Sequence, residues 1–122
     1  MKLNPKLKAD VEKYKDHVII VEGKKDVAAL KSLGFGKIYA IHQTSVPIKI
    51  RVEEISKLID KNEKVCILTD FDKKGKQLYL LLKPMFQELG VKVDSGLRGL
   101  VLVSGVSHIE GLYDFLKKIE NL

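Results

Sequence analysis

The sequence predicts an α/β fold: a single compact domain in which helices cover both faces of a mainly parallel central sheet. Short runs rich in β-branched and apolar residues alternate along the chain with segments whose apolar residues recur at helical spacing. A chain of 122 residues also has room for only one hydrophobic core of ordinary size. We therefore expect one domain that extends over residues 1–122.

The expected elements begin with a Lys-rich segment, residues 1–15, whose narrow apolar side suits a helix packed on the domain. Five runs predict strands, the fourth of them weaker than the rest: residues 17–22, 37–41, 64–70, 91–94 and 100–103. Between and after them, apolar stripes predict helices at residues 27–33, 52–59 and 78–89. Gly34 suits the end of the first of these helices, since glycine adopts positive φ without strain. Ser107 and Glu110 have the spacing of a capping box, so the last helix is expected to begin at Ser107.

The amino-acid composition of the chain favours some classes of protein and excludes others. A formal net charge of +6 favours a polyanionic partner. The single cysteine, Cys66, excludes an internal disulfide framework and a zinc ribbon, and its apolar surroundings favour a core position. No apolar run has the length of a membrane span, and the N-terminal segment lacks the apolar core of a signal peptide, so we expect a cytoplasmic protein. The abundance of Lys, Glu and Ile favours a thermophilic source.

Three acidic side chains follow apolar runs where strands are expected to end. Glu22 comes after residues 18–21, and Asp70 and Asp72 come after residues 65–68. Parallel strands bring their carboxyl ends to one edge of a sheet, so these carboxylates are expected to converge. Hard divalent cations prefer clustered oxygen ligands, and Mg²⁺ is usually held by one or two carboxylates. The sequence thus predicts a Mg²⁺ site, with Mn²⁺ as an alternative ion.

Each acid also has a purely structural interpretation. An isolated Asp-x-Asp pair is typical of turns and helix caps, where carboxylates accept hydrogen bonds from backbone N–H groups. Glu22 favours the metal interpretation, because a glutamate that ends an apolar strand before Gly23 has no packing role. Asp26 would either help to hold a second metal ion or complement the dipole at a helix start, and both interpretations stay open.

Basic side chains flank both acidic segments. The candidate phosphate-binding lysines are Lys24, Lys25, Lys73, Lys74 and Lys76. Lysines and helix-start amides attract phosphate, and they stabilise charge that develops during phosphoryl transfer. Arg98, expected in a flexible connection before the strand at 100–103, is a further candidate because a guanidinium binds phosphate bidentately. For any single one of these residues, a solvated surface position is the simpler interpretation.

Two segments together resemble a Toprim domain: Ile20-Val21-Glu22-Gly23-Lys24-Lys25-Asp26 and Thr69-Asp70-Phe71-Asp72-Lys73-Lys74-Gly75. The resemblance covers nearly the whole chain. It implies a Rossmann-like fold in which Glu22 corresponds to the family glutamate, and Asp70 and Asp72 correspond to the metal-binding pair. The family includes topoisomerases, bacterial primases, recombination proteins and nucleases, so the resemblance also implies a nucleic acid, RNA or DNA, as partner.

The sequence departs from the topoisomerase pattern at Lys74, where those enzymes often carry a third acid. Its Asp-x-Asp-x-x-Gly form is more similar to the nuclease branches, including the maturase that trims 5S ribosomal RNA precursors. The segment Gly105-Val106-Ser107-His108 is loosely similar to that branch as well. His42 and His108 do not indicate zinc, since no cysteine or histidine cluster accompanies them.

The preferred hypothesis is a metal-dependent nuclease in which Glu22, Asp70 and Asp72 are catalytic. The alternative is a non-catalytic module that keeps the acidic site and delivers nucleic acid to a partner protein. Small size favours this alternative, because strong catalysis demands substrate positioning as well as metal chemistry. A complete topoisomerase or primase is disfavoured, since the chain lacks the additional domains that those reactions need. A third interpretation is an α/β protein whose acids only cap loops.

Overall fold

Four parallel strands form the sheet of this protein in a computed structural model that describes residues 5–42 and 45–120. They are β1 (Val18–Val21), β2 (Lys37–Ala40), β3 (Lys64–Ile67) and β4 (Lys92–Val93). Their order in the sheet is β2-β1-β3-β4, and every neighbouring pair is parallel. The α/β class, the parallel sheet and four of the predicted strands are therefore confirmed.

The register of the central strands places the acidic segments at one edge. Val18 of β1 pairs with Val65 of β3, and the two strands run side by side from there. Pairing continues just beyond β3, where the Leu68 N–H donates to the Ile20 carbonyl at 2.7 Å. The carboxyl ends of β1 and β3 consequently meet at the same edge of the sheet, and Glu22 and Asp70 follow them directly.

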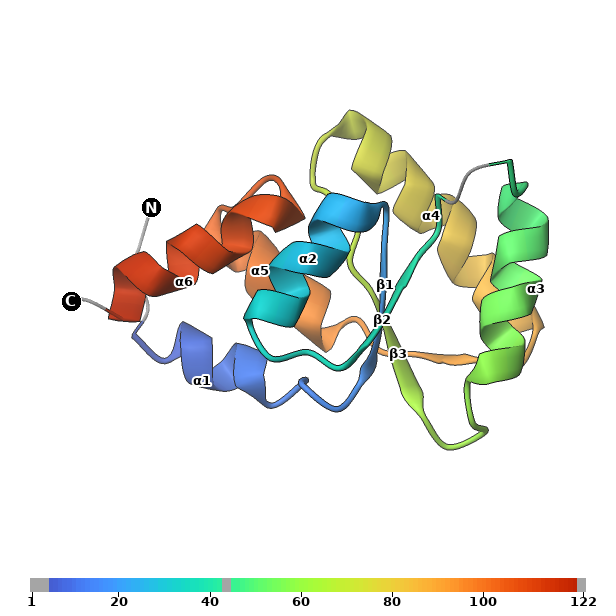
Figure 1. The fold of residues 1–122 in the computed structure, drawn as a ribbon, viewed down its shortest axis with the longest axis horizontal. Coiled ribbons are helices and arrows are strands. Elements are labelled where there is room, and N and C mark those ends of the chain that lie inside the picture. Colours follow the sequence, from blue (N-terminus) through green and yellow to red (C-terminus); the bar gives the residue numbers. More distant parts are fainter. Residues whose placement is uncertain (1–4, 43–44, 121–122) are drawn as a thin grey trace.

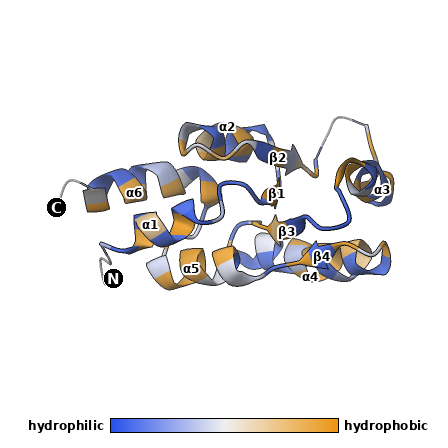
Figure 2. Cartoon of the chain, turned by 90° about the horizontal axis from the view of Figure 1, so that it is seen from below, coloured by the Kyte–Doolittle hydropathy of each residue, from blue (hydrophilic) through white to orange (hydrophobic). Residues whose placement is uncertain are grey.

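Helices cover both faces of this sheet (Figures 1 and 2). Viewed from below, α1, α2, α5 and α6 lie on one side of the column of strands, and α3 lies on the other (Figure 2). The buried side chains of α4 pack with those of α3. The helices are α1 (Leu7–Glu12), α2 (Lys24–Ser32), α3 (Ile48–Leu58), α4 (Lys73–Glu88), α5 (Gly96–Ser104) and α6 (Leu112–Glu120), with a 3₁₀ turn, η1 (Ile109–Gly111), before α6. Among the described residues, none of these helices has both the length and the apolar composition to cross a membrane.

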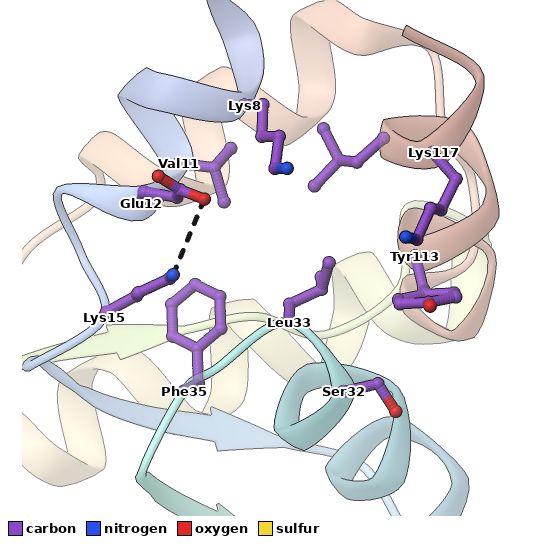
Figure 3. A pocket seen from close by; sticks show the side chains of 10 residues that line it. Lys8, Val11, Glu12, Lys15, Ser32, Leu33, Phe35, Tyr113 and Lys117 are labelled. Carbon is purple, nitrogen blue, oxygen red and sulfur yellow. Dashed lines mark ion pairs between the residues drawn. The ribbon is translucent and has the colours of Figure 1, made fainter. Parts of the chain in front are cut away.

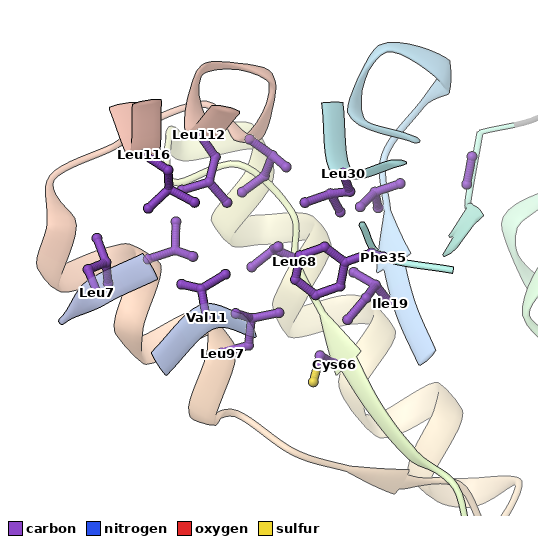
Figure 4. Packing of buried hydrophobic residues seen from close by; sticks show 14 of the residues in the cluster. Leu7, Val11, Ile19, Leu30, Phe35, Cys66, Leu68, Leu97, Leu112 and Leu116 are labelled. Atoms are coloured by element: carbon purple, nitrogen blue, oxygen red, sulfur yellow. The ribbon is translucent and has the colours of Figure 1, made fainter. Parts of the chain in front are cut away.

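Alternating strand residues supply two hydrophobic clusters. Ile19 and Cys66 face the cluster with α1, α2, α5 and α6, where Phe35 packs beside Ile19 and Leu68 (Figure 4). Ile20 faces the opposite cluster with α3 and α4. Burial on both faces explains why the central strands β1 and β3 are nearly continuous apolar runs in the sequence rather than alternating ones.

The N-terminal helix is confirmed in part of its expected range. The predicted segment was residues 1–15, and α1 occupies Leu7–Glu12, while residues 1–4 lie outside the described part of the chain. Leu7 and Val11 are buried against α5 and α6. Gly34 follows α2 with φ of 95°, so the glycine stop expected there is also confirmed.

The strand predicted at residues 100–103 is wrong, because this segment belongs to α5. Leu97, Val101 and Ser104 are buried at helical spacing, whereas 56% of Leu102 and 85% of Val103 remain exposed. The run is apolar almost throughout, as the colouring of α5 in Figure 2 shows, so its composition resembles that of a buried strand. Packing of one side of the segment on α1 and β3 selects the helix instead.

The start of the last helical segment also differs from the expectation. His108, rather than Ser107, is the residue before η1, and α6 begins only at Leu112. The Ser107 hydroxyl lies 3.0 Å from His108 Nδ1 and caps no amide. The first amide of η1, that of Ile109, donates instead to Asp70 Oδ1 at 2.8 Å. A carboxylate from a distant loop thus satisfies the amide for which local spacing suggested a serine cap.

Candidate metal centre

Two aspartates and a histidine form a group of potential metal ligands among the described residues. One ligand atom from each of Asp70, Asp72 and His108 lies within 4.8 Å of the others. Asp70 and Asp72 occupy the loop between β3 and α4, whereas His108 comes from the loop between α5 and η1. About half of the Asp72 and His108 side chains is exposed, and His108 Nε2 lies 3.5 Å from Asp72 Oδ2. The group is therefore open to solvent and to a substrate.

Asp70 joins the two loops. Its Oδ1 accepts a hydrogen bond from the Ile109 amide at 2.8 Å, and the Phe71 amide donates to the Ser107 carbonyl at 2.8 Å. These bonds on either side of His108 hold its loop against the end of β3. Ligand positioning here depends on contacts between segments almost forty positions apart in the chain.

Asp72 caps a helix, and its position stays compatible with the metal-binding role that the sequence also left open. It is the N-cap of α4, and its Oδ1 accepts a hydrogen bond from the Gly75 amide at 2.8 Å. Its Oδ2 lies towards His108. Helix capping therefore occupies one carboxylate oxygen and leaves the other beside the potential ligands.

Gly75 allows this tight turn. A Cβ atom at this position would lie 2.1 Å from the Asp70 carbonyl oxygen, closer than any side chain tolerates. The Thr69 hydroxyl donates to the Gly75 carbonyl at 2.7 Å, which fixes the first turn of α4 to the end of β3. A steric clash with the Asp70 backbone thus explains why glycine stands at the last position of the Asp-x-Asp-x-x-Gly pattern.

Glu22 adjoins Asp70 but is not one of the three grouped ligands. Its Oε1 accepts a hydrogen bond from the Asp70 amide at 3.3 Å. Burial raises the pKa of Glu22, and the neighbouring Asp70 charge raises it further. Glu22 and Asp70 also line a common surface hollow with Asp26. The predicted convergence of segments around residues 22 and 70 is therefore present in the structure.

Asp26 serves the start of α2. Only 8% of its side chain is exposed, and its Oδ2 accepts a hydrogen bond from the Gly23 amide at 3.1 Å. Burial raises the pKa of this carboxyl, and the charge of Asp70 adds to the increase. The geometry realises the helix-start interpretation, while the role in holding a second metal ion stays a prediction.

The candidate lysines surround the acids to different degrees. Lys24 and Lys25 line the hollow that contains Glu22 and Asp70. Lys74 lines a neighbouring hollow that also contains Glu22. Lys73 and Lys76 are exposed in the first turn of α4. Three of the five lysines thus border the hollows beside Glu22, and two lie on the adjoining helix surface.

Arg98 is buried in α5, not placed in the flexible connection that the sequence suggested. Its Nη1 donates to the Thr69 carbonyl at 2.7 Å, and its guanidinium lies 4.4 Å from the Phe71 ring and 4.3 Å from the Tyr79 ring. Arg98 therefore supports the backbone just before Asp70. Its contact with phosphate stays a prediction, and the observed partners favour a positioning role.

Sequence reasoning missed His108 as a candidate ligand. The residue lacks a local metal motif, and its nearness to Asp72 arises because residues 105–108 pack against the end of β3. The signals in the sequence were its place near an expected element end, which suits contact with a substrate, and the loose similarity of this segment to the maturase branch. Imidazole is a common ligand of transition-metal ions, whereas Mg²⁺ prefers oxygen ligands.

The donor set fits a divalent cation. Two aspartate carboxylates and a histidine nitrogen supply ligand types that such ions accept, and Glu22 adds a third carboxylate next to Asp70. Burial and like charge disfavour the ionised form of Glu22, so a cation would relieve that cost.

Comparison with known proteins decides the family. The family model described as Toprim domain matches residues 17–97, which include both acidic segments and all four strands. The chain is a member of the Toprim domain family. This membership accounts for the Rossmann-like arrangement and implies a metal-binding function related to nucleic acids.

This Toprim protein is similar to several archaeal proteins. A UPF0292 protein of Methanocaldococcus jannaschii is 35% identical over 104 residues, which cover 82% of this chain and 78% of the relative. A UPF0292 protein of Methanosarcina barkeri is 35% identical over 107 residues, with 84% and 71% covered. A solved structure of a putative protein from Aquifex aeolicus has a TM-score of 0.71 and 22% identity, and the match covers 86% of this chain and 94% of that one. The first two place the Toprim protein among the UPF0292 proteins, and the third supports the fold alone.

Proposed function

We propose that this Toprim protein is a nuclease that cleaves nucleic-acid phosphodiester bonds with the help of Mg²⁺ or Mn²⁺. The observation that supports the proposal is the meeting of Asp70, Asp72 and His108 within 4.8 Å, with Glu22 hydrogen-bonded to the Asp70 amide. Metal-dependent hydrolysis needs such an open, acid-rich site beside a basic surface that binds phosphate. Processing of RNA is one form that this activity would take.

Each group has a distinct part in the proposed reaction. Asp70, Asp72 and His108 would hold the ion, which when bound supplies Lewis-acid polarisation of the phosphate and acidifies water. Glu22 would accept the proton of the attacking water, whose oxygen forms a bond to phosphorus as the bond to the leaving oxygen breaks. The leaving oxygen would take a proton from solvent. Lys24 and Lys25, which line the hollow beside Glu22, would bind the flanking phosphates.

A cleavage panel tests this function. Structured RNA, single-stranded DNA and duplex DNA are incubated with the purified protein, with Mn²⁺, with Mg²⁺ and with a chelator. We expect cleavage of at least one substrate that depends on the metal and falls by roughly 100-fold or more in Glu22→Gln, since a general base contributes about that much. The glutamine keeps an oxygen for the Asp70 amide, so the fold should survive.

The matched control is Glu54→Gln, which alters an exposed glutamate on α3 and should leave the rate unchanged. Tight nucleic-acid binding without metal-dependent turnover would contradict the nuclease and support the non-catalytic module. Cleavage that survives Glu22→Gln undiminished would point to a contaminating enzyme or to another site.

A further inference from the structure

Two hollows adjoin Glu22, and they differ in chemistry. The one beside Asp70 is lined by charged and polar side chains and by Gly23. The other, the α4 hollow, has a volume of about 360 Å³. Its lining combines polar side chains with two leucines: Glu22, His42, Lys74, Gln77, Leu78 and Leu81. Glu22 and His42 line both hollows, so the two are neighbours.

Sheet pairing and one face of a helix form the α4 hollow. Pairing between β1 and β2 continues beyond both strands, since the His42 amide donates to the Glu22 carbonyl at 2.9 Å. Leu82 and Phe86, which are fully buried, fix α4 against the core. The lining residues of α4, at positions 74, 77, 78 and 81, have helical spacing and form one stripe beside that buried face. The hollow thus lies between α4 and the ends of β1 and β2.

Leu78 and Leu81 give the α4 hollow an accessible apolar side. Leu81 is 49% exposed, and Leu78 packs, partly buried, against the core cluster with α3. When a flat ring covers such a surface, apolar area is removed from water, which is favourable. The α4 hollow is therefore suited to a ligand with an apolar face.

The cavity between α1, α2 and α6 has a different character (Figure 3). Val11, Phe35 and Leu116, which line it, are at most 3% exposed. Lys15 on its rim lies 3.5 Å from Glu12, the ion pair that Figure 3 marks. The protein itself thus covers these apolar groups and pairs this charge, so the α4 hollow offers more accessible apolar surface to a ligand.

Three exposed polar side chains complete the α4 hollow. The amide of Gln77 offers both donors and an acceptor, as the edges of nucleobases do. The imidazole ring of His42 provides a surface on which a base stacks. The ammonium group of Lys74 attracts the phosphate of the same nucleotide. Together with the leucines, these groups match the face, the edge and the charge of one nucleotide.

We propose that the α4 hollow binds one unpaired base of a single-stranded nucleic acid, beside the phosphodiester that the proposed nuclease would cleave. The charged hollow suits the sugar–phosphate backbone, and the α4 hollow suits the base. Glu22 borders both, which places the proposed proton acceptor where the two parts of a nucleotide meet. The choice of a base over other polar rings rests on the proposed function.

This arrangement makes the proposed nuclease selective for unpaired segments. A base within a duplex is stacked and paired, so it enters a hollow of this kind only after it leaves the stack, which costs free energy. A single strand, a loop or an overhang avoids this cost. Substrates with unpaired bases should therefore bind more tightly than a blunt duplex.

Methyl NMR of the full chain, at low salt and without metal so that the strand stays intact, tests the site. The probes are two single-stranded octanucleotides, one of RNA and one of DNA. A base in the hollow should shift the methyl resonances of Leu78 and Leu81 through its ring current, and a shift with either probe supports the site. The methyl resonances of Leu80 should stay in place, because Leu80 is 70% exposed and lines neither hollow. A blunt duplex of the same sequence should shift none of the three.

The affinity for the single strand distinguishes Leu81 from its neighbour. Leu81→Asn should weaken binding by roughly tenfold, a typical loss for one base contact. Leu80→Asn is the matched control, since it makes the same change at the adjacent, more exposed residue and should bind as the unaltered protein does. Fluorescence anisotropy measures the affinities, and far-UV circular dichroism checks that both variants fold. Equal affinities of the two variants would overturn the proposal, as would the absence of Leu81 methyl shifts with both octanucleotides or equal shifts with the duplex.

Failure of this site is distinguishable from failure of the proposed function. Shifts at Leu78 and Leu81 without cleavage in any metal would leave the base site in place and contradict the nuclease. Metal-dependent cleavage that is equally fast on single strand and duplex, and unchanged in Leu81→Asn, would support the nuclease and overturn the base site.

Discussion

Asp70 has the most connections of the residues in the metal centre. Its carboxylate accepts the Ile109 amide, its own amide donates to Glu22, and its carbonyl lies 3.4 Å from Arg98 Nη2. Each bond reaches a segment distant in the chain, so one residue aligns β1, α5 and η1 around the site. Changes at Asp70 must therefore preserve its acceptor oxygen if chemistry and folding are to be separated.

Asp70→Asn provides such a change. The asparagine retains an oxygen for the Ile109 amide but loses the negative charge, so we expect Mn²⁺ affinity to fall at least roughly tenfold, since even partners of direct ligands contribute that much. Isothermal calorimetry measures the loss. Asp114→Asn, an exposed site on α6, should bind as the unaltered protein does. Equal affinity in the two variants would remove Asp70 from the ligand set.

The reactivity of Cys66 tests whether this part of the core is closed to solvent. Burial raises the pKa of its thiol to about 12, and its side chain has no exposed surface. The thiol is thus neutral in the folded protein at pH 8. Above the ordinary thiol pKa the unfolded chain loses the proton while the folded protein keeps it, so the free energy of unfolding falls as the pH rises towards 12. We expect an aromatic disulfide reagent to label Cys66 only after denaturation. Rapid stoichiometric labelling of the native protein would contradict the buried position.

At the scale of elements, the turn from β3 into α4 brings a helix cap and two candidate ligands together in a few residues. Gly75 lets the helix start pass close to the Asp70 carbonyl, while Thr69 and Arg98 hold the adjoining backbone. Asp72 caps α4 with one oxygen and presents the other towards His108. Helix capping and ligand placement are consequently coupled but are chemically separable.

Two substitutions of Asp72 separate them. Asparagine is as good an N-cap as aspartate, so Asp72→Asn should change the free energy of unfolding by only a few tenths of a kcal/mol, while Asp72→Ala should lower it by about 1 kcal/mol. Both should weaken Mn²⁺ binding, because both remove the charge beside His108. Urea denaturation and calorimetry provide the two readouts. Full metal affinity in Asp72→Asn would show that the residue only caps α4.

At the scale of the whole molecule, basic residues gather around the acidic edge of the sheet. Lys24, Lys25 and Lys74 line the hollows beside Glu22, and Lys73 and Lys76 are exposed on the adjoining turn of α4. Part of the net charge of +6 thus lies beside the candidate metal centre. Such an arrangement favours a polyanion at this edge.

Salt dependence measures this charge arrangement. If these five lysines (Lys24, Lys25, Lys73, Lys74 and Lys76) each neutralise one phosphate of a single strand, the logarithm of the binding constant should fall with the logarithm of salt concentration at a slope of about −3.5. Replacement of Lys24 and Lys25 by glutamine should reduce the slope by about 1.4, since each contact contributes about 0.7. Fluorescence anisotropy at several salt concentrations measures both slopes. The same change at Lys57 and Lys61, exposed lysines that line neither of the hollows beside Glu22, should leave the slope unaltered.

Local patterns were sufficient for the fold class, four strands and the position of Glu22, Asp70 and Asp72, because apolar periodicity and strand-end acids are visible without tertiary contacts. Three features needed the tertiary structure. The segment at 100–103 is helical, Arg98 is buried under the site and His108 joins the acids. In each, the outcome depends on packing or hydrogen bonds between segments far apart in the chain, and such contacts leave no periodic signal in a single sequence.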